Sequence, residues 1–199
     1  MSKRLVPVLL VLMVIAIAVQ PAAAQNNKFK IFAGMSYVSP LSDDDIDVEG
    51  VTEAVEASSE VGYTIGFEWR LGELMGIELD YLDATHDVEI GGVVVGETGM
   101  APLSATLNFH LINTKLIDLY LGPTVSYVSW DDIELTDGDS VPTDSETAFG
   151  ASLGIDIGLG ERFAIIGGLR YLQLDVTPED GDGLAVDPLF ARLGLAYRF

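Results

Sequence analysis

Apolar residues recur at every second position in several separate segments of the chain. The alternation is regular in 60–71, 102–111, 146–157 and 189–199, and weaker versions cover 29–39, 76–87, 118–131 and 163–176. Successive side chains of a β-strand point to opposite faces, so this period predicts eight strands with one apolar face each. The other face carries Gly, Ser, Thr and ionised residues. After residue 25 no helical period is visible.

The connections between these segments alternate in length. Short turns are expected near 72–75, 112–117 and 159–162, and long acidic loops at 40–58, 88–99, 131–145 and 177–186. The strands of a soluble β-sandwich also alternate between apolar and polar residues, so the character of the two faces must decide. A soluble barrel encloses its apolar face. In this sequence the face with small and charged residues fits a narrow interior, and the apolar face is left for the outside. Closure satisfies every backbone amide, as a bilayer requires, and short turns opposite long loops are typical of outer-membrane barrels. We therefore predict an all-β fold, an eight-stranded antiparallel up-and-down transmembrane barrel over 25–199.

The N-terminus has the pattern of a secretory signal. Lys3 and Arg4 precede an apolar run over 5–19, and small residues end at Ala24. Fifteen apolar residues are too few for an ordinary spanning helix of about 20 residues. We expect residues 1–24 to be a cleaved signal peptide that directs export through the periplasm. The alternative is an uncleaved anchor.

Composition excludes several classes of function. The chain has 31 Asp+Glu against 10 Lys+Arg, a net charge of −21, and no cysteine. Such a chain repels phosphates, which argues against a nucleic-acid partner. The absence of cysteine excludes disulfides, thiolate metal sites and a Cys nucleophile. An apolar content of 49% argues against disorder, and the sequence predicts no cofactor and no metal site.

Several segments carry a resemblance to a known family. They are Tyr37 to Pro40, Gly76 to Leu79, 101–111 followed by 119–127, 186–188, and the terminal Tyr197-Arg198-Phe199. With these the mature chain resembles the OmpW family of small Gram-negative outer-membrane barrels. The resemblance implies a narrow, porin-like channel that moves small hydrophobic molecules toward the membrane through a lateral opening. It also implies that Tyr197 and Phe199 form the signal recognised by the outer-membrane assembly machinery. The very acidic loops depart from the commoner family pattern.

The strand phase predicts a charged plug in the periplasmic half and middle of the lumen. An eight-stranded interior holds only side chains or one small ligand, so buried charges there should pair. Five cations and four acids are assigned to this plug: Lys30, Glu68, Arg70, Glu78, Asp80, Asp156, Arg170, Arg192 and Arg198. A proton or ion path through these groups is the functional alternative to a structural plug.

The same phase predicts an apolar vestibule in the outer half of the lumen. Its expected lining is Val38, Leu82, Val128, Trp130, Leu172, Leu174 and Val176, together with Ala84 and Phe190. An apolar funnel closed beneath by ion pairs would accept a hydrophobic solute and force it to leave sideways. The alternative is that these residues pack against folded-in loops, in a sealed structural or adhesive barrel of the OmpX type without a transport role.

An enzyme is not expected. The two histidines, His86 and His110, have no convergent nucleophile in the sequence pattern. The expected partners are outer-membrane lipid and lipopolysaccharide, the assembly machinery and small hydrophobic solutes. The acidic loops are either a solvated surface or a site where divalent cations bridge the protein to lipopolysaccharide.

Overall fold

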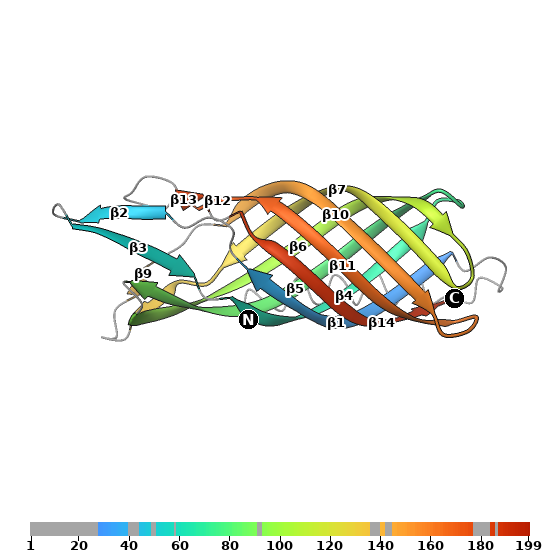
Figure 1. Cartoon of the computed structure of the whole chain (residues 1–199), viewed down its shortest axis with the longest axis horizontal. Coiled ribbons are helices and arrows are strands. Elements are labelled where there is room, and N and C mark those ends of the chain that lie inside the picture. Colours follow the sequence, from blue (N-terminus) through green and yellow to red (C-terminus); the bar gives the residue numbers. More distant parts are fainter. Residues whose placement is uncertain are drawn as a thin grey trace.

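The fold is that of a computed structural model, which describes residues 28–39, 44–48, 51–57, 59–90, 93–135, 140–141, 145–176, 184–185 and 187–199. The signal peptide expected at 1–24 lies outside these residues. Eight long strands form the body of the molecule (Figure 1). They are β1 (Phe29–Ser39), β4 (Glu60–Arg70), β5 (Met75–Ile90), β6 (Val93–Asn113), β7 (Ile117–Trp130), β10 (Glu146–Gly158), β11 (Phe163–Gln173) and β14 (Leu189–Arg198).

These strands close into a barrel. Each pairs antiparallel with two neighbours, in the order β1-β4-β5-β6-β7-β10-β11-β14. The last strand then pairs with the first, from Lys30 opposite Arg198 to Ser39 opposite Leu189. The predicted eight-stranded antiparallel barrel is confirmed. Among the described residues, no helix is long and apolar enough to cross a membrane.

The long connections contain strands that the sequence pattern did not indicate, namely β2 (Asp44–Val48), β3 (Val51–Ala57), β8 (Ile133–Leu135), β9 (Ser140–Val141) and β13 (Leu184–Ala185). The segment predicted as one strand over 163–176 is divided, because β11 ends at Gln173 and β12 (Asp175–Val176) pairs with β13. The loop predicted at 88–99 is wrong, because β5 and β6 continue their pairing to Ile90 opposite Val93. Its β-branched residues favour strand, and this preference outweighs the glycines and acids that suggested a loop.

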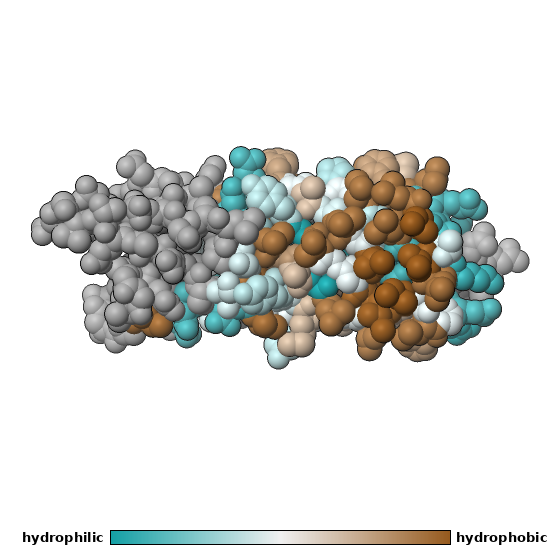
Figure 2. Space-filling model, in the orientation of Figure 1, coloured by the Kyte–Doolittle hydropathy of each residue, from teal (hydrophilic) through white to brown (hydrophobic). Residues whose placement is uncertain are grey.

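The outer wall of the barrel is apolar. Large side chains at alternate positions are exposed, with Tyr63 at 73% and Leu193 at 66%. Hydrophobic residues cover much of the visible barrel wall (Figure 2). Strands of 11 residues tilted by about 40° span roughly 28 Å, which matches the hydrocarbon core of a bilayer. An exposed apolar band of this extent is accounted for by lipid contact, and not by a water-soluble surface.

The start of β1 and the C-terminus lie together at the end of the barrel that carries the short turns (Figure 1). The turns connect β4 to β5, β6 to β7 and β10 to β11. Phe29 N donates to the Phe199 carbonyl at 3.2 Å, and Phe199 N donates to the Phe29 carbonyl at 2.9 Å. The terminal Tyr197 and Phe199 rings also contact each other at a centroid distance of 5.9 Å. We expect this end to face the periplasm.

Candidate functional site

The lumen is filled by two adjoining groups of inward side chains. The first, which we name the charged layer, lies nearer the short turns and consists of Lys30, Glu68, Arg70, Glu78, Asp80, His110, Asp118, Asp156, Arg170, Arg192 and Arg198. The second, the apolar cluster, lies nearer the long connections and consists of Val38, Leu82, Ala84, Met100, Val128, Ala148, Leu172, Leu174 and Phe190. Strand alternation places both groups on the inner face.

Lys30 is at the centre of the part of the charged layer that lies nearest the short turns. Its ammonium lies 2.5 Å from Glu68 Oε2 and 3.1 Å from Asp156 Oδ2, and the whole residue is 2% exposed. Arg198 Nη2 donates to Asp156 Oδ2 at 3.0 Å, and the Tyr120 hydroxyl donates to the other oxygen at 3.0 Å. The Lys30 ammonium lies over the Tyr120 ring, 4.6 Å from the ring centroid. Gly154 leaves the room for this ring, since a Cβ there would lie 2.2 Å from Tyr120 Cε2.

His110 joins two carboxylates of the same layer. Its Nε2 lies 2.9 Å from Glu68 Oε1 and its Nδ1 lies 2.8 Å from Asp118 Oδ1. Only the Nδ1 contact has the geometry of a hydrogen bond, and because an ionised carboxylate only accepts, Nδ1 donates to Asp118. Arg70 contacts the same two acids: its Nε lies 3.2 Å from Glu68 Oε1, and its Nη2 donates to Asp118. These contacts join β4, β6 and β7 across the lumen.

Two arginines belong to the part of the charged layer that lies nearest the apolar cluster. Arg170 holds Asp80 through two parallel hydrogen bonds of 2.8 and 2.5 Å, a bidentate geometry that fixes both side chains. Arg170 Nη1 also donates to Ser104 Oγ at 2.9 Å. Arg192 Nη1 donates to Glu78 Oε1 at 2.9 Å, and its guanidinium stacks over the Phe32 ring at 4.4 Å.

The structure brings together all nine residues that the sequence assigned to the charged plug, and it adds others. Asp118 and Tyr120 were missed, although they share the strand phase that places Val128 and Trp130 inside. The expectation of four acids facing five cations is therefore wrong. Five Lys or Arg side chains face five carboxylates, and His110 bridges two of those carboxylates.

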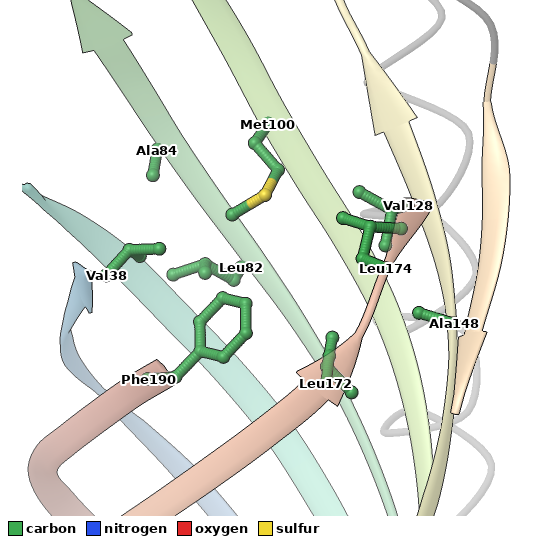
Figure 3. Packing of buried hydrophobic residues seen from close by; sticks show 9 residues of the cluster. All are labelled: Val38, Leu82, Ala84, Met100, Val128, Ala148, Leu172, Leu174 and Phe190. Atoms are coloured by element: carbon green, nitrogen blue, oxygen red, sulfur yellow. The ribbon is translucent and has the colours of Figure 1, made fainter. Parts of the chain in front are cut away.

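The apolar cluster closes the lumen above the charged layer. Its nine side chains point toward one another in the interior (Figure 3), and none is more than 5% exposed. Seven of the nine residues assigned to the vestibule belong to it: Val38, Leu82, Ala84, Val128, Leu172, Leu174 and Phe190. Trp130 packs against it while partly buried. The side chain of Val176 lies outside the described residues.

The cluster also contains residues that the sequence analysis did not assign to the lumen. Met100 was missed because it borders the region predicted as a loop, and Ala148 because a methyl group contributes little to a hydrophobic pattern. Both share the inward phase of their strands. The Leu174 amide donates to Asp187 Oδ1 at 3.2 Å, which holds this end of β11 in place.

The ladder between β5 and β6 is interrupted beside the apolar cluster. Tyr81 pairs with Leu103 and Ala84 pairs with Met100, but between β5 and β6 the ladder assigns no pair at the two intervening positions, although the register is the same on both sides. Pro102 occupies one of them, and proline has no amide hydrogen to donate to the ladder. A second interruption, between β6 and β7, occurs at Pro123, at the level of the hydrogen-bonded Thr106 and Thr124 below the cluster.

A cavity of about 30 Å³ lies between the two groups. Asp80, Arg170, Arg192 and Tyr120 line its charged side, and Leu82 and Phe190 line its apolar side. Ser36, Thr64, Ser152 and Gly168 extend the polar wall, and Leu153 and Leu169, whose side chains are exposed on the outer wall of the barrel, also line the cavity. A space of this size holds a small polar group or one to a few water molecules.

The described residues provide no metal site, because no group of three or more His, Asp or Glu is arranged to hold an ion. His110 belongs to the charged layer. His86 is buried in β5, and Asp87, its neighbour in sequence, is partly exposed on the opposite strand face.

A sequence model described as "Outer membrane protein beta-barrel domain" matches residues 9–199. No curated protein matches the chain. Solved structures with the same fold include the outer membrane protein OprG from Pseudomonas aeruginosa, with 20% identity, 86% of this chain and 95% of that chain covered, and a TM-score of 0.73.

Two further structures resemble the chain at similar identity. The outer membrane protein AlkL in DMPC lipid bilayers shows 19% identity over 89% of this chain and 93% of that chain, with a TM-score of 0.61. The Escherichia coli outer membrane protein W shows 17% identity over 89% of this chain and 100% of that chain, with a TM-score of 0.60. The resemblance to the OmpW family is thereby confirmed at the level of the fold.

Proposed function

The chain belongs to the outer-membrane β-barrel domain family, and we propose that it forms a narrow channel for small hydrophobic molecules with a lateral exit into the membrane. Its place is the outer membrane of a Gram-negative type of cell envelope. The observation that carries the proposal is the apolar cluster, which fills the outer half of the lumen of a barrel whose inner half is charged.

The charged layer makes a passage along the full barrel axis unfavourable for an apolar solute. The layer spans the lumen through ion pairs from all eight barrel strands, including Lys30 of β1, Asp156 of β10 and Arg198 of β14. An apolar molecule entering it would separate buried charges from their partners, at a cost of several kcal/mol. A solute in the apolar cluster therefore leaves by another route.

The interrupted ladder at Pro102 supports a route through the wall. It lies between Leu82 and Met100, two members of the apolar cluster, and one amide hydrogen bond is missing there by the chemistry of proline. Fewer hydrogen bonds must break to separate β5 from β6 at this level than in the regular stretch of the same pair from Met75 to Tyr81. The missing bond makes this stretch of the wall the expected place of exit.

Entry of a solute requires movement within the cluster. Met100, 1% exposed, is unbranched and adapts its shape at low cost, so its displacement opens space beside the Pro102 interruption. Burial of about 250 Å² of solute apolar surface supplies about 6 kcal/mol before the costs of association. The expected affinity is therefore micromolar at best.

The test is fluorescence of the refolded protein in the Trp69→Phe background, where Trp130 beside the cluster is the remaining tryptophan. Titration with octane and toluene should give a saturable change in emission. Leu174→Asp should abolish it, because an unpaired carboxylate keeps water in the site. Gln173→Asp, a charge at the adjacent exposed position, should bind as the parent does.

A second candidate function is a sealed structural or adhesive barrel. The observation that favours it is the close packing of the apolar cluster, none of whose members exceeds 5% exposure. This function predicts no saturable change in the parent protein, or equal binding by a well-folded Leu174→Asp variant. Either result would contradict the channel.

Further assignments follow from the sequence. We propose that residues 1–24 are removed during export and that the assembly machinery recognises Tyr197 and Phe199 at the C-terminus. We also propose that lipopolysaccharide contacts the outer part of the wall and that the barrel has no catalytic role.

A further inference from the structure

We propose that the cavity between the charged layer and the apolar cluster binds the carboxylate head of a medium-chain amphiphile whose chain lies in the cluster. This inference rests on the proposed channel and names its preferred substrate class.

The polar wall of the cavity offers hydrogen-bond donors without partners. Arg170 Nε and Arg192 Nε are buried and make no hydrogen bond to any of the described residues. Ser36 Oγ and Thr64 Oγ1 share one hydrogen bond of 2.6 Å, so one of the two hydroxyl protons is left outside that pair. A buried donor that makes no hydrogen bond is costly, so a group that accepts from these atoms is favoured here.

The acceptors of the same wall are already used. Arg170 binds both oxygens of Asp80, and the Tyr120 hydroxyl oxygen accepts from Lys30 Nζ at 3.4 Å. A head group that must donate hydrogen bonds, such as an ammonium, therefore finds few acceptors. A carboxylate only accepts, and bonds from arginine to a carboxylate are about twice as strong as those between neutral groups.

The opposite side of the cavity continues into the apolar cluster. Leu82 and Phe190 line the cavity and are also members of the cluster. A head held by Arg170 and Arg192 would thus leave its alkyl chain among cluster side chains. The geometry suits one small polar head with an unbranched apolar chain.

The test compares octane, 1-octanol and octanoate at pH 7, using Trp130 emission in the Trp69→Phe background. Octanoate should bind the parent about tenfold more tightly than octane, with 1-octanol between them, because a hydrogen bond to a charged group contributes 1.4 kcal/mol or more. The partition of each solute into detergent micelles is measured without protein, and each affinity is corrected for it.

Gly168→Val should remove the preference for octanoate and keep octane binding within about twofold. Gly168 lines the cavity, and a Cβ there would lie 3.3 Å from the Leu153 carbonyl oxygen and 3.7 Å from Arg192 Nε, so the valine methyl groups occupy the space of the head. The matched control is Gly167→Val, because Gly167 is the next residue of β11 and a Cβ there would meet Ile155 Cγ2 at 3.4 Å, on the outer face. This control should keep the preference.

Each outcome decides the inference. Equal affinities for octane and octanoate in the parent would overturn the head site and leave the channel standing. A preference that survives in Gly168→Val would also overturn it, because the head would then bind elsewhere. If no solute binds, both the channel and the head site fail. Should Gly168→Val not fold, Gly168→Ala, which adds one methyl group, gives the same comparison.

Discussion

The charged layer and the apolar cluster are built by the same strands, and the change from one to the other occurs within two residues. Asp80 and Leu82 on β5, Arg170 and Leu172 on β11, and Arg192 and Phe190 on β14 mark this boundary. Inward positions two residues apart lie roughly 7 Å apart along a strand. Alternate residues of the same strands therefore line two parts of the lumen that have opposite chemistry.

The two interiors differ in what a displacement costs. The ion pairs of Lys30 with Glu68 and Asp156, and of Arg70 with Glu68, have N···O distances of 2.5–3.2 Å, and losing one partner leaves a buried charge. Contacts in the apolar cluster are non-directional, so a hydrophobic solute can replace side-chain neighbours at little loss. The charged layer therefore suits a fixed barrier across the lumen, which we call the floor, and the apolar cluster suits a region that opens for a solute.

The largest expected effect is that of Lys30→Met. It removes the cation between Glu68 and Asp156, and breaking a buried pair costs about 3–5 kcal/mol. The measurement is the urea unfolding midpoint of the refolded barrel. Lys28→Met, at an exposed position just before β1, is the control and should change stability by less than about 0.5 kcal/mol. An unchanged midpoint for Lys30→Met would mean that water screens the layer.

Substitution of the arginines by methionine should give smaller and graded losses. Without Arg192, Glu78 keeps only Arg170 at 3.7 Å, so we expect about 3 kcal/mol. Without Arg198, Asp156 keeps Lys30, and without Arg70, Asp118 keeps His110, so each should cost about 1–2 kcal/mol. The same urea titrations test this order. Equal losses in the three variants would show that the alternative partners do not compensate.

The sequence predicted the barrel and the inner face because both follow from a period of two, which every strand repeats. Asp118 and Tyr120 could have been found from the phase of Val128, but a polar residue near a turn is easily assigned to the turn. Which cation meets which acid could not be predicted, since Lys30 and Asp156 are 126 residues apart and meet only through closure and register. The extension of β5 and β6 was hidden by acids and glycines, and the interruption at Pro102 required the strand register.

Pro102→Ala should have the smallest effect on stability. It is also the sharpest test of whether the apolar cluster opens while the charged layer stays fixed. The substitution supplies an amide hydrogen opposite Leu82, where the ladder between β5 and β6 lacks pairing. One added hydrogen bond should raise the free energy of unfolding by about 1 kcal/mol. Hydrogen exchange of the amide at position 102 reports whether the bond forms.

Closing the ladder at this level should also slow solute delivery. The measurement is the rate at which intact cells that produce the protein take up N-phenylnaphthylamine, a dye that fluoresces in lipid. Pro123→Ala is the matched control, because it fills the interruption between β6 and β7 at the level of Thr106 and Thr124, below the apolar cluster. If exit occurs beside the cluster, Pro102→Ala slows uptake and Pro123→Ala does not. Uptake that is unchanged in Pro102→Ala despite a protected amide at position 102 would show that the solute does not leave between β5 and β6, and the apolar cluster would then be a second seal above the floor.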